Sequence, residues 1–166
     1  MKNVEQFKSS LQKELADYLA KQQSFFAEYE IRILDLDFFP WPWDHGQLII
    51  SYLVVGEDHW EEKAQKNSEY YTPDWKFNEF NNMFDGHEGH ALEELFAEYW
   101  EDFEYWDNWD ENAEGAITRE EMFRHFSSVV KSEQVMSAIK GYNLSKDFKI
   151  RVSDPRYDFD EEFDVI

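Results

Sequence analysis

The sequence predicts a single α+β domain in which a small antiparallel sheet, a hairpin plus a C-terminal strand, packs against several helices. Apolar residues recur at helical spacing near the N-terminus and again after residue 90, whereas between residues 30 and 56 they alternate with polar residues or form β-branched runs. Aromatic residues make up 19% of the 166-residue chain, and disordered acidic chains are poor in aromatics. We find no internal repeat and no interdomain linker, so we expect one domain over residues 1–153.

The N-terminal third is expected to form a helix followed by a β-hairpin. An amphipathic helix is predicted over residues 3–26, with these apolar residues at helical spacing: Val4, Phe7, Leu11, Leu15, Tyr18 and Leu19. Leucine or phenylalanine then alternates with aspartate over residues 34–38, which is typical of a half-buried strand. A second strand, rich in β-branched residues, starts at Gln47, and the prolines and glycine of residues 40–46 predict a loop between the two strands.

The rest of the chain is expected to be mainly helical, after a polar, irregular stretch over residues 57–74. Helices are predicted over residues 73–84, 91–109, 119–131 and 132–140, with a turn at residues 85–90 and a stop at Gly141. A final strand is predicted from residue 147 to Pro155, and the acidic composition of residues 154–166 favours a disordered tail. We expect the core to be aromatic and to include Leu36, Phe38, Ile49, Tyr52, Phe96 and Phe103.

Charge limits the classes of partner. The chain has 16 Lys and Arg against 37 Asp and Glu, for a formal net charge of -21. So large a negative charge opposes binding to nucleic acid or to an anionic membrane, and it favours basic protein partners or metal cations; the alternative is that it serves solubility. With no cysteine, the chain lacks disulfides and thiolate sites. No apolar segment resembles a signal peptide or approaches the roughly 20 residues of a membrane span, so we expect a cytoplasmic protein.

Residues 110–121, DENAEGAITREE, resemble the twelve-residue calcium loop of an EF-hand. The candidate calcium ligands, at the loop positions that supply oxygen, are Asp110, Asn112, Glu114, Ala116 through its carbonyl, Thr118 and Glu121. A glutamate at the fifth position is longer than the usual residue there, and the chain has no second loop with which this one could pair. The alternative, which we favour, is a capping box in which Thr118 caps the next helix and Glu121 bonds back to it.

The sequence gives weaker support for a zinc site or a catalytic site. His87 and His90 lie near Asp85 and Glu88, but two histidines without a third, distant ligand make a weak zinc site, and the glycines of this segment indicate a turn. The chain has no glycine-rich phosphate loop, no G-x-S-x-G elbow and no H-E-x-x-H motif. We therefore expect a non-enzymatic protein with no catalytic site.

The acidic helix predicted from residue 91 is the strongest candidate for a binding surface. From Glu98 to Glu114 there are acids and no basic residue, although like charges three or four residues apart destabilise a helix by roughly 0.2–0.5 kcal/mol per pair. Aromatic residues that often anchor interfaces are interleaved with these acids. The candidate partner-binding residues are Glu94, Glu98, Glu101, Asp102, Tyr105 and Trp109. The alternative is a solvated helix face.

Two short motifs, DWKFNEF at residues 74–80 and NLSKDFKIRVSDP at residues 143–155, resemble segments of small acidic bacterial immunity proteins encoded beside toxins. The predicted layout of an amphipathic helix, a hairpin and acidic helices is also similar. The resemblance implies a cytoplasmic protein that binds and blocks a toxin domain, and it assigns no residue roles because such surfaces vary with the toxin. A basic, nuclease-like toxin domain would suit the acidic helix. Two alternatives stay open: a calcium-binding protein with one EF-hand-like loop, and an acidic DNA mimic that blocks a nucleic-acid-binding protein.

Overall fold

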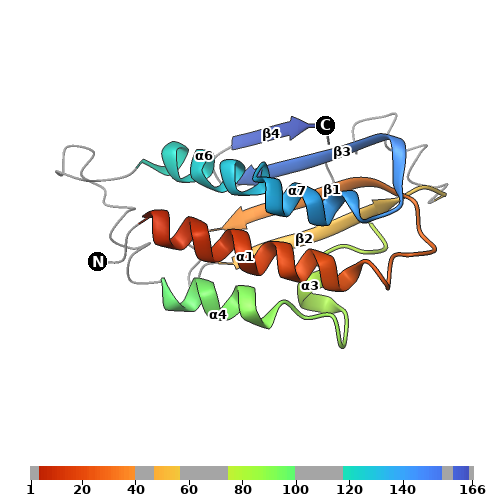
Figure 1. Ribbon diagram of the computed structural model, residues 1–166, viewed down its shortest axis with the longest axis horizontal. Helices are drawn as coiled ribbons and strands as arrows, with labels where there is room; N and C mark the ends of the chain where they lie inside the picture. The colour runs from red at the N-terminus through yellow and green to blue at the C-terminus, as the bar shows by residue number, and fades with distance from the viewer. Residues whose placement is uncertain (1–3, 40–46, 57–74, 100–117, 155–158, 165–166) are drawn as a thin grey trace.

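The structure is a computed structural model that describes residues 4–39, 47–56, 75–99, 118–154 and 159–164, and the statements below concern these residues. Its elements are α1 (Val4–Gln22), β1 (Ile31–Phe39), β2 (Gln47–Val54), α3 (Phe80–Met83), α4 (His90–Glu98), α6 (Arg119–Val130), α7 (Glu133–Lys140), β3 (Leu144–Asp154) and β4 (Phe159–Phe163). The strands form one sheet, and α1, α4, α6 and α7 lie on the same side of it (Figure 1). This arrangement confirms the predicted α+β class. Among the helices described, none combines the length and apolarity needed to cross a membrane.

The sheet is mixed, so the expectation of an antiparallel sheet is wrong. Its strand order is β2-β1-β3-β4, in which β1 pairs antiparallel with β2 and parallel with β3, and β3 pairs antiparallel with β4. The hairpin partners β1 and β2 are those that the sequence predicts. Parallel neighbours need a long crossover connection, and the chain between β2 and β3, which includes α4, α6 and α7, supplies it.

Part of the acidic C-terminal segment is a strand, so the expected disorder of residues 154–166 is wrong for residues 159–163. β4 lies at the edge of the sheet, where its backbone pairs with β3. The Glu161 carboxylate also accepts hydrogen bonds from Ser127 and Lys131, which attach the strand to the end of α6. These partners are distant in sequence, and for this reason composition alone predicted disorder.

The predicted helices at both ends of the chain are confirmed. α1 ends at Gln22 and not near residue 26, and it buries the apolar residues expected from its period except Val4, which is half-buried. α6 and α7 begin after the capping residues Thr118 and Ser132, and α7 ends at Gly141 as predicted. The helix predicted over residues 91–109 is confirmed as α4 as far as Glu98, and its remainder lies outside the described residues.

The helix predicted over residues 73–84 is mostly wrong, because α3 covers only residues 80–83. Phe77 instead forms an isolated antiparallel bridge to β2, in which Tyr52 N lies 3.1 Å from Phe77 O. Trp75 and Phe77 are both buried, but in different clusters. Packing against β2 therefore outweighs the weak local helical preference of this segment.

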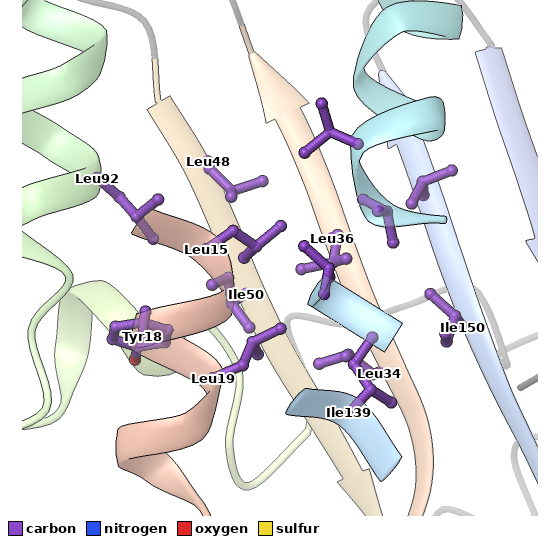
Figure 2. Packing of buried hydrophobic residues seen from close by; sticks show 14 of the residues in the cluster. Leu15, Tyr18, Leu19, Leu34, Leu36, Leu48, Ile50, Leu92, Ile139 and Ile150 are labelled. Atoms are coloured by element: carbon purple, nitrogen blue, oxygen red, sulfur yellow. The ribbon is translucent and has the colours of Figure 1, made fainter. Parts of the chain in front are cut away.

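One hydrophobic core fills the space between the sheet and the helices (Figure 2). The strands contribute Leu34, Leu36, Leu48, Ile50 and Ile150, and the helices contribute Leu15, Tyr18, Leu19, Leu92 and Ile139. Of the predicted core residues, Leu36, Phe38, Tyr52 and Phe96 are at most 1% exposed, and Phe103 lies outside the described residues. Ile49 is only half-buried, which corrects its prediction. It pairs with Asp37 and lies on the other face of the sheet.

Leu36→Ala should lower the free energy of unfolding by about 2–5 kcal/mol, because it would leave a cavity in a closed core. Ile49→Ala on the neighbouring strand should cost clearly less, because the Ile49 side chain is half-exposed and lies on the opposite face. Urea denaturation of the two variants measures both losses. Equal losses would contradict the assignment of the two sheet faces.

Candidate functional site

The orientation of α4 is set by its apolar stripe. Leu92, Leu95 and Phe96 are buried against the core. The Phe7 ring of α1 packs edge-on against Phe96 and Tyr99, with ring centroids 5.9 and 5.2 Å apart. Aromatic contacts of this geometry add to the apolar burial. With one side of the helix held in this way, the other side must face solvent.

The solvent-facing side of α4 is acidic. Glu93, Glu94 and Glu98 are exposed there, and no Lys or Arg occurs in the chain between Lys76 and Arg119. Glu93 lies in the first turn, where a negative charge interacts favourably with the helix dipole, whereas Glu98 lies in the last turn, at the negative end. The charge pattern is therefore not the one that helix stability alone would favour.

A groove of about 530 Å³ lies between α1 and the start of α4. Its acidic lining comes from both sides, with Glu14 and Asp17 on α1 and with Glu88 and Glu94 before and on α4. Lys13 neutralises part of this charge, because its Nζ lies 2.7 Å from Glu14 Oε1 and 3.2 Å from Asp17 Oδ2. We call the following six residues the acidic α4 surface: Glu14, Asp17, Glu88, Glu93, Glu94 and Glu98.

His87 ties the turn before α4 to α1. Its Nδ1 lies 2.7 Å from Gln22 Oε1, and its carbonyl accepts a hydrogen bond of 2.8 Å from the Tyr18 hydroxyl. Its ring packs against Phe25 and Phe80, with ring centroids 4.6 and 5.2 Å away. These contacts give His87 a packing role in a turn. Within the part of the chain that the structure describes, no group of three or more His, Asp or Glu side chains is placed to hold a metal ion.

Asn81 ties the same region to the sheet. Its side chain is 4% exposed, its Nδ2 donates to the Leu48 carbonyl at 2.7 Å, and its Oδ1 accepts from Ile50 N at 2.8 Å. Its own carbonyl accepts a hydrogen bond of 2.9 Å from Gly89 N, directly before α4. The acidic α4 surface is thus attached both to α1 and to the edge of β2. Sequence reasoning missed this role, because an asparagine in an aromatic segment does not distinguish a sheet-edge anchor from a loop residue.

The structure places two of the predicted partner-binding residues, Glu94 and Glu98, on the exposed side of α4. The other four, Glu101, Asp102, Tyr105 and Trp109, lie outside the described residues. The structure also brings Glu14 and Asp17 of α1 close to α4 across the groove. Helical periodicity could not predict this proximity, since it depends on how the two helices pack.

The predicted capping box is present at the start of α6. Glu121 N donates to Thr118 Oγ1 at 3.1 Å, and Thr118 N donates to Glu121 Oε2 at 2.9 Å. Hydrogen bonds from the backbone and hydroxyl of Thr118 hold the pKa of the Glu121 carboxyl below its usual value. The other candidate calcium ligands, Asp110, Asn112, Glu114 and Ala116, lie outside the described residues. Calcium binding by this loop therefore stays a prediction.

Comparison of the chain with protein-family models, with curated proteins and with solved structures finds no match in any of the three.

Thr118→Ala should destabilise the protein by about 0.5–2 kcal/mol, because the amide of Glu121 would lose its hydrogen-bond acceptor. Ser128→Ala is a suitable control, since Ser128 is exposed on the same helix and its hydroxyl donates to the His125 carbonyl within that helix. It should change stability by less than about 0.5 kcal/mol. Thermal or denaturant unfolding compares the two, and a Thr118→Ala variant as stable as the control would refute the cap.

Isothermal titration with millimolar calcium should give no saturable heat if residues 118–121 serve only as a cap. Glu121→Gln separates the two interpretations, because glutamine can complete a capping box but cannot act as a bidentate calcium ligand. Saturable calcium binding by the wild type that this substitution weakens sharply would establish the EF-hand-like site instead.

Proposed function

We propose that the protein is a non-enzymatic, cytoplasmic inhibitor that binds a basic, nuclease-like toxin domain through the acidic α4 surface. The main support for this proposal is the uneven distribution of charge over the described residues. The interpretation of the chain as an immunity-type protein rests on this distribution and on the resemblance of its two short motifs.

On the α6–β4 side, cations accompany the acids. Arg124 Nη2 lies 2.5 Å from Glu120 Oε1, Lys149 Nζ lies 2.5 Å from Glu162 Oε1, and Lys131 pairs with Glu161. Such exposed pairs contribute little to stability, typically about 0–1 kcal/mol. They do reduce the local negative charge, so this side of the protein would attract a basic partner weakly.

On the α4 side, acids prevail. Lys13 and Lys21 of α1 lie beside the groove, whereas α4 itself carries three exposed glutamates and neither lysine nor arginine. The contact of Glu93 with His90 is 3.8 Å long and is ionic only when the histidine is protonated. A surface of this sign steers a basic protein toward it and repels nucleic acid.

The attachment of this surface also supports a binding role. The contacts of Asn81 to β2 and of His87 to α1 hold the start of α4 before any partner arrives. A preorganised surface loses less conformational entropy on association, and more of the interaction energy is then available as affinity. A DNA mimic would use the same surface against a nucleic-acid-binding protein, so the identity of the partner, and not the site, separates these two functions.

The experiment measures binding to the product of the gene that neighbours the gene for this protein. A double charge reversal, Glu94→Lys with Glu98→Lys, should slow association on the order of tenfold, because the acidic α4 surface then no longer attracts the basic partner electrostatically. It should also make the association rate less sensitive to salt. Glu98→Lys places a cation in the last turn of α4, which helix stability favours, so the fold should persist.

The matched control is Asp160→Lys with Asp164→Lys, two exposed aspartates at or beside β4, on the side of the protein away from α4 (Figure 1). It changes net charge by the same amount and should slow association by no more than about threefold, through net charge alone. Equal slowing by both pairs would rule out the acidic α4 surface as the docking site. If the neighbouring gene product does not bind the wild-type protein, the proposed partner is wrong.

A further inference from the structure

On the sheet face opposite the helices, two aspartates of β1 lie beside one arginine of β3. The parallel register aligns Asp35 with Arg151 and Asp37 with Ser153. Arg151 Nε donates to Asp35 Oδ1 at 2.8 Å, and the Ser153 hydroxyl donates to Asp37. The Arg151 guanidinium also lies against the Trp75 ring, 5.3 Å from its centroid. We call these five residues the ionic cluster.

Much of the ionic cluster is shielded from water. Asp35 is 2% exposed, Trp75 is 4% exposed and Arg151 is 8% exposed, whereas Asp37 and Ser153 are half-buried. Asp35 pairs directly with the one guanidinium of the cluster, and the charge of the same guanidinium acts on Asp37. A buried pair of equal and opposite charges can compensate its own desolvation, but a second carboxylate leaves an excess negative charge that desolvation penalises.

The neighbouring elements add more negative than positive charge. β2 places the uncharged Ser51 opposite Asp35. The charged groups of the described residues on the segments around the cluster include Lys76 and Glu79 after Trp75, Lys149 and Asp154 on β3, and Asp160 and Glu162 on β4. Lys76 Nζ lies over the rings of Tyr29 and Phe77, 5.2 and 5.0 Å from their centroids. Lys149 is already engaged with Glu162, with Nζ and Oε1 2.5 Å apart. Within the described residues, Arg151 is the cation whose charge acts on Asp37.

This environment favours protonation. Burial, with the charge of Asp37 second, raises the pKa of Asp35 to about 6, against the opposing attraction of Arg151. Burial also raises the pKa of Asp37, although its hydrogen bond from Ser153 opposes the shift. A carboxyl whose pKa is higher in the folded than in the unfolded state binds its proton more tightly in the folded protein. The stabilisation that comes from binding this proton is complete at pH values below the pKa of the carboxyl in the unfolded state. It is lost as the pH rises through the pKa of the carboxyl in the folded state.

We propose that the ionic cluster is a proton-uptake site, in which the Asp35–Asp37 pair binds one proton between neutral and mildly acidic pH and this uptake strengthens the native fold. The site would link pH to the position of Trp75, which stacks on Arg151. Trp75 in turn begins the segment that bridges to β2 through Phe77 and carries Asn81 toward α4. The proposal does not depend on the binding function above.

The test compares wild type, Asp35→Asn and Asp164→Asn by denaturant unfolding at pH 7.5 and pH 5.0. Asp164 serves as the control because it is an exposed aspartate directly after β4, outside the row of residues that pair across the sheet with the cluster. The wild-type folding equilibrium constant should rise on acidification, and Asp35→Asn should remove about tenfold of that rise, since pH 5.0 lies one pH unit below a folded pKa of about 6 and one unit is tenfold. Asp164→Asn should retain the wild-type response. The proposal would be overturned if the folding equilibrium constant of Asp35→Asn rose on acidification as much as that of the wild type. It would also be overturned if the wild type lost stability on acidification and Asp35→Asn did not.

A measurement on the wild type keeps the proposal testable if Asp35→Asn does not fold. Carbon-13 NMR of the side-chain carboxyls, followed from pH 8 to pH 3 in the folded protein, gives the midpoint for each assigned aspartate. The Asp35 carboxyl should titrate above the value of about 4 that is ordinary for aspartate. A midpoint at or below that value would make the cluster an ordinary salt bridge and exclude proton uptake near neutral pH.

Discussion

The rest of the structure depends on β1 lying between β2 and β3 with both of its faces buried. Toward the helices it presents Leu34, Leu36 and Phe38, each at most 2% exposed, and the other face carries Asp35, also 2% exposed. A strand with one apolar and one ionic buried face has two different requirements. Helices must cover the first, and a cation must be brought to the second. The helices α1, α4, α6 and α7 cover the apolar face, and β3 carries Arg151 opposite Asp35.

This arrangement also determines where the acidic surface lies. α4 follows the hairpin, and its apolar stripe packs on the helix-facing side of the sheet and against α1. Its glutamates must then face solvent beside the acids of α1. On the α6–β4 side of the described residues, Arg124, Lys131 and Lys149 each pair with a glutamate. α4 itself carries neither lysine nor arginine for such pairs within the helix, and Glu94 and Glu98 stand four residues apart, a spacing of like charges that helix stability does not favour.

Sequence patterns predicted features that depend on near neighbours in the chain. The period of α1, the hairpin of β1 and β2, the Thr118–Glu121 cap and the end of α7 at Gly141 are all local, and all are confirmed. The exposed position of Glu94 and Glu98 also follows from helical period. The parallel pairing of β1 with β3, the strand β4 and the bridge of Phe77 to Tyr52 join distant segments, so composition and period gave no sign of them. The same is true of the burial of Asp35, since strand alternation places an aspartate on a face without showing what covers that face.

The most direct test of the central claim, that the acidic α4 surface is the docking site, is zero-length carbodiimide cross-linking of the protein with the product of its neighbouring gene. This reagent joins a carboxylate to a lysine only where the two are in contact. If the acidic α4 surface is the docking site, partner lysines should cross-link to Glu93, Glu94 or Glu98. These cross-links should be lost at high salt, where the electrostatic attraction between the two proteins is screened. Cross-links confined to Asp160, Glu162 or Asp164 at the β4 edge, with none to α4, would contradict it.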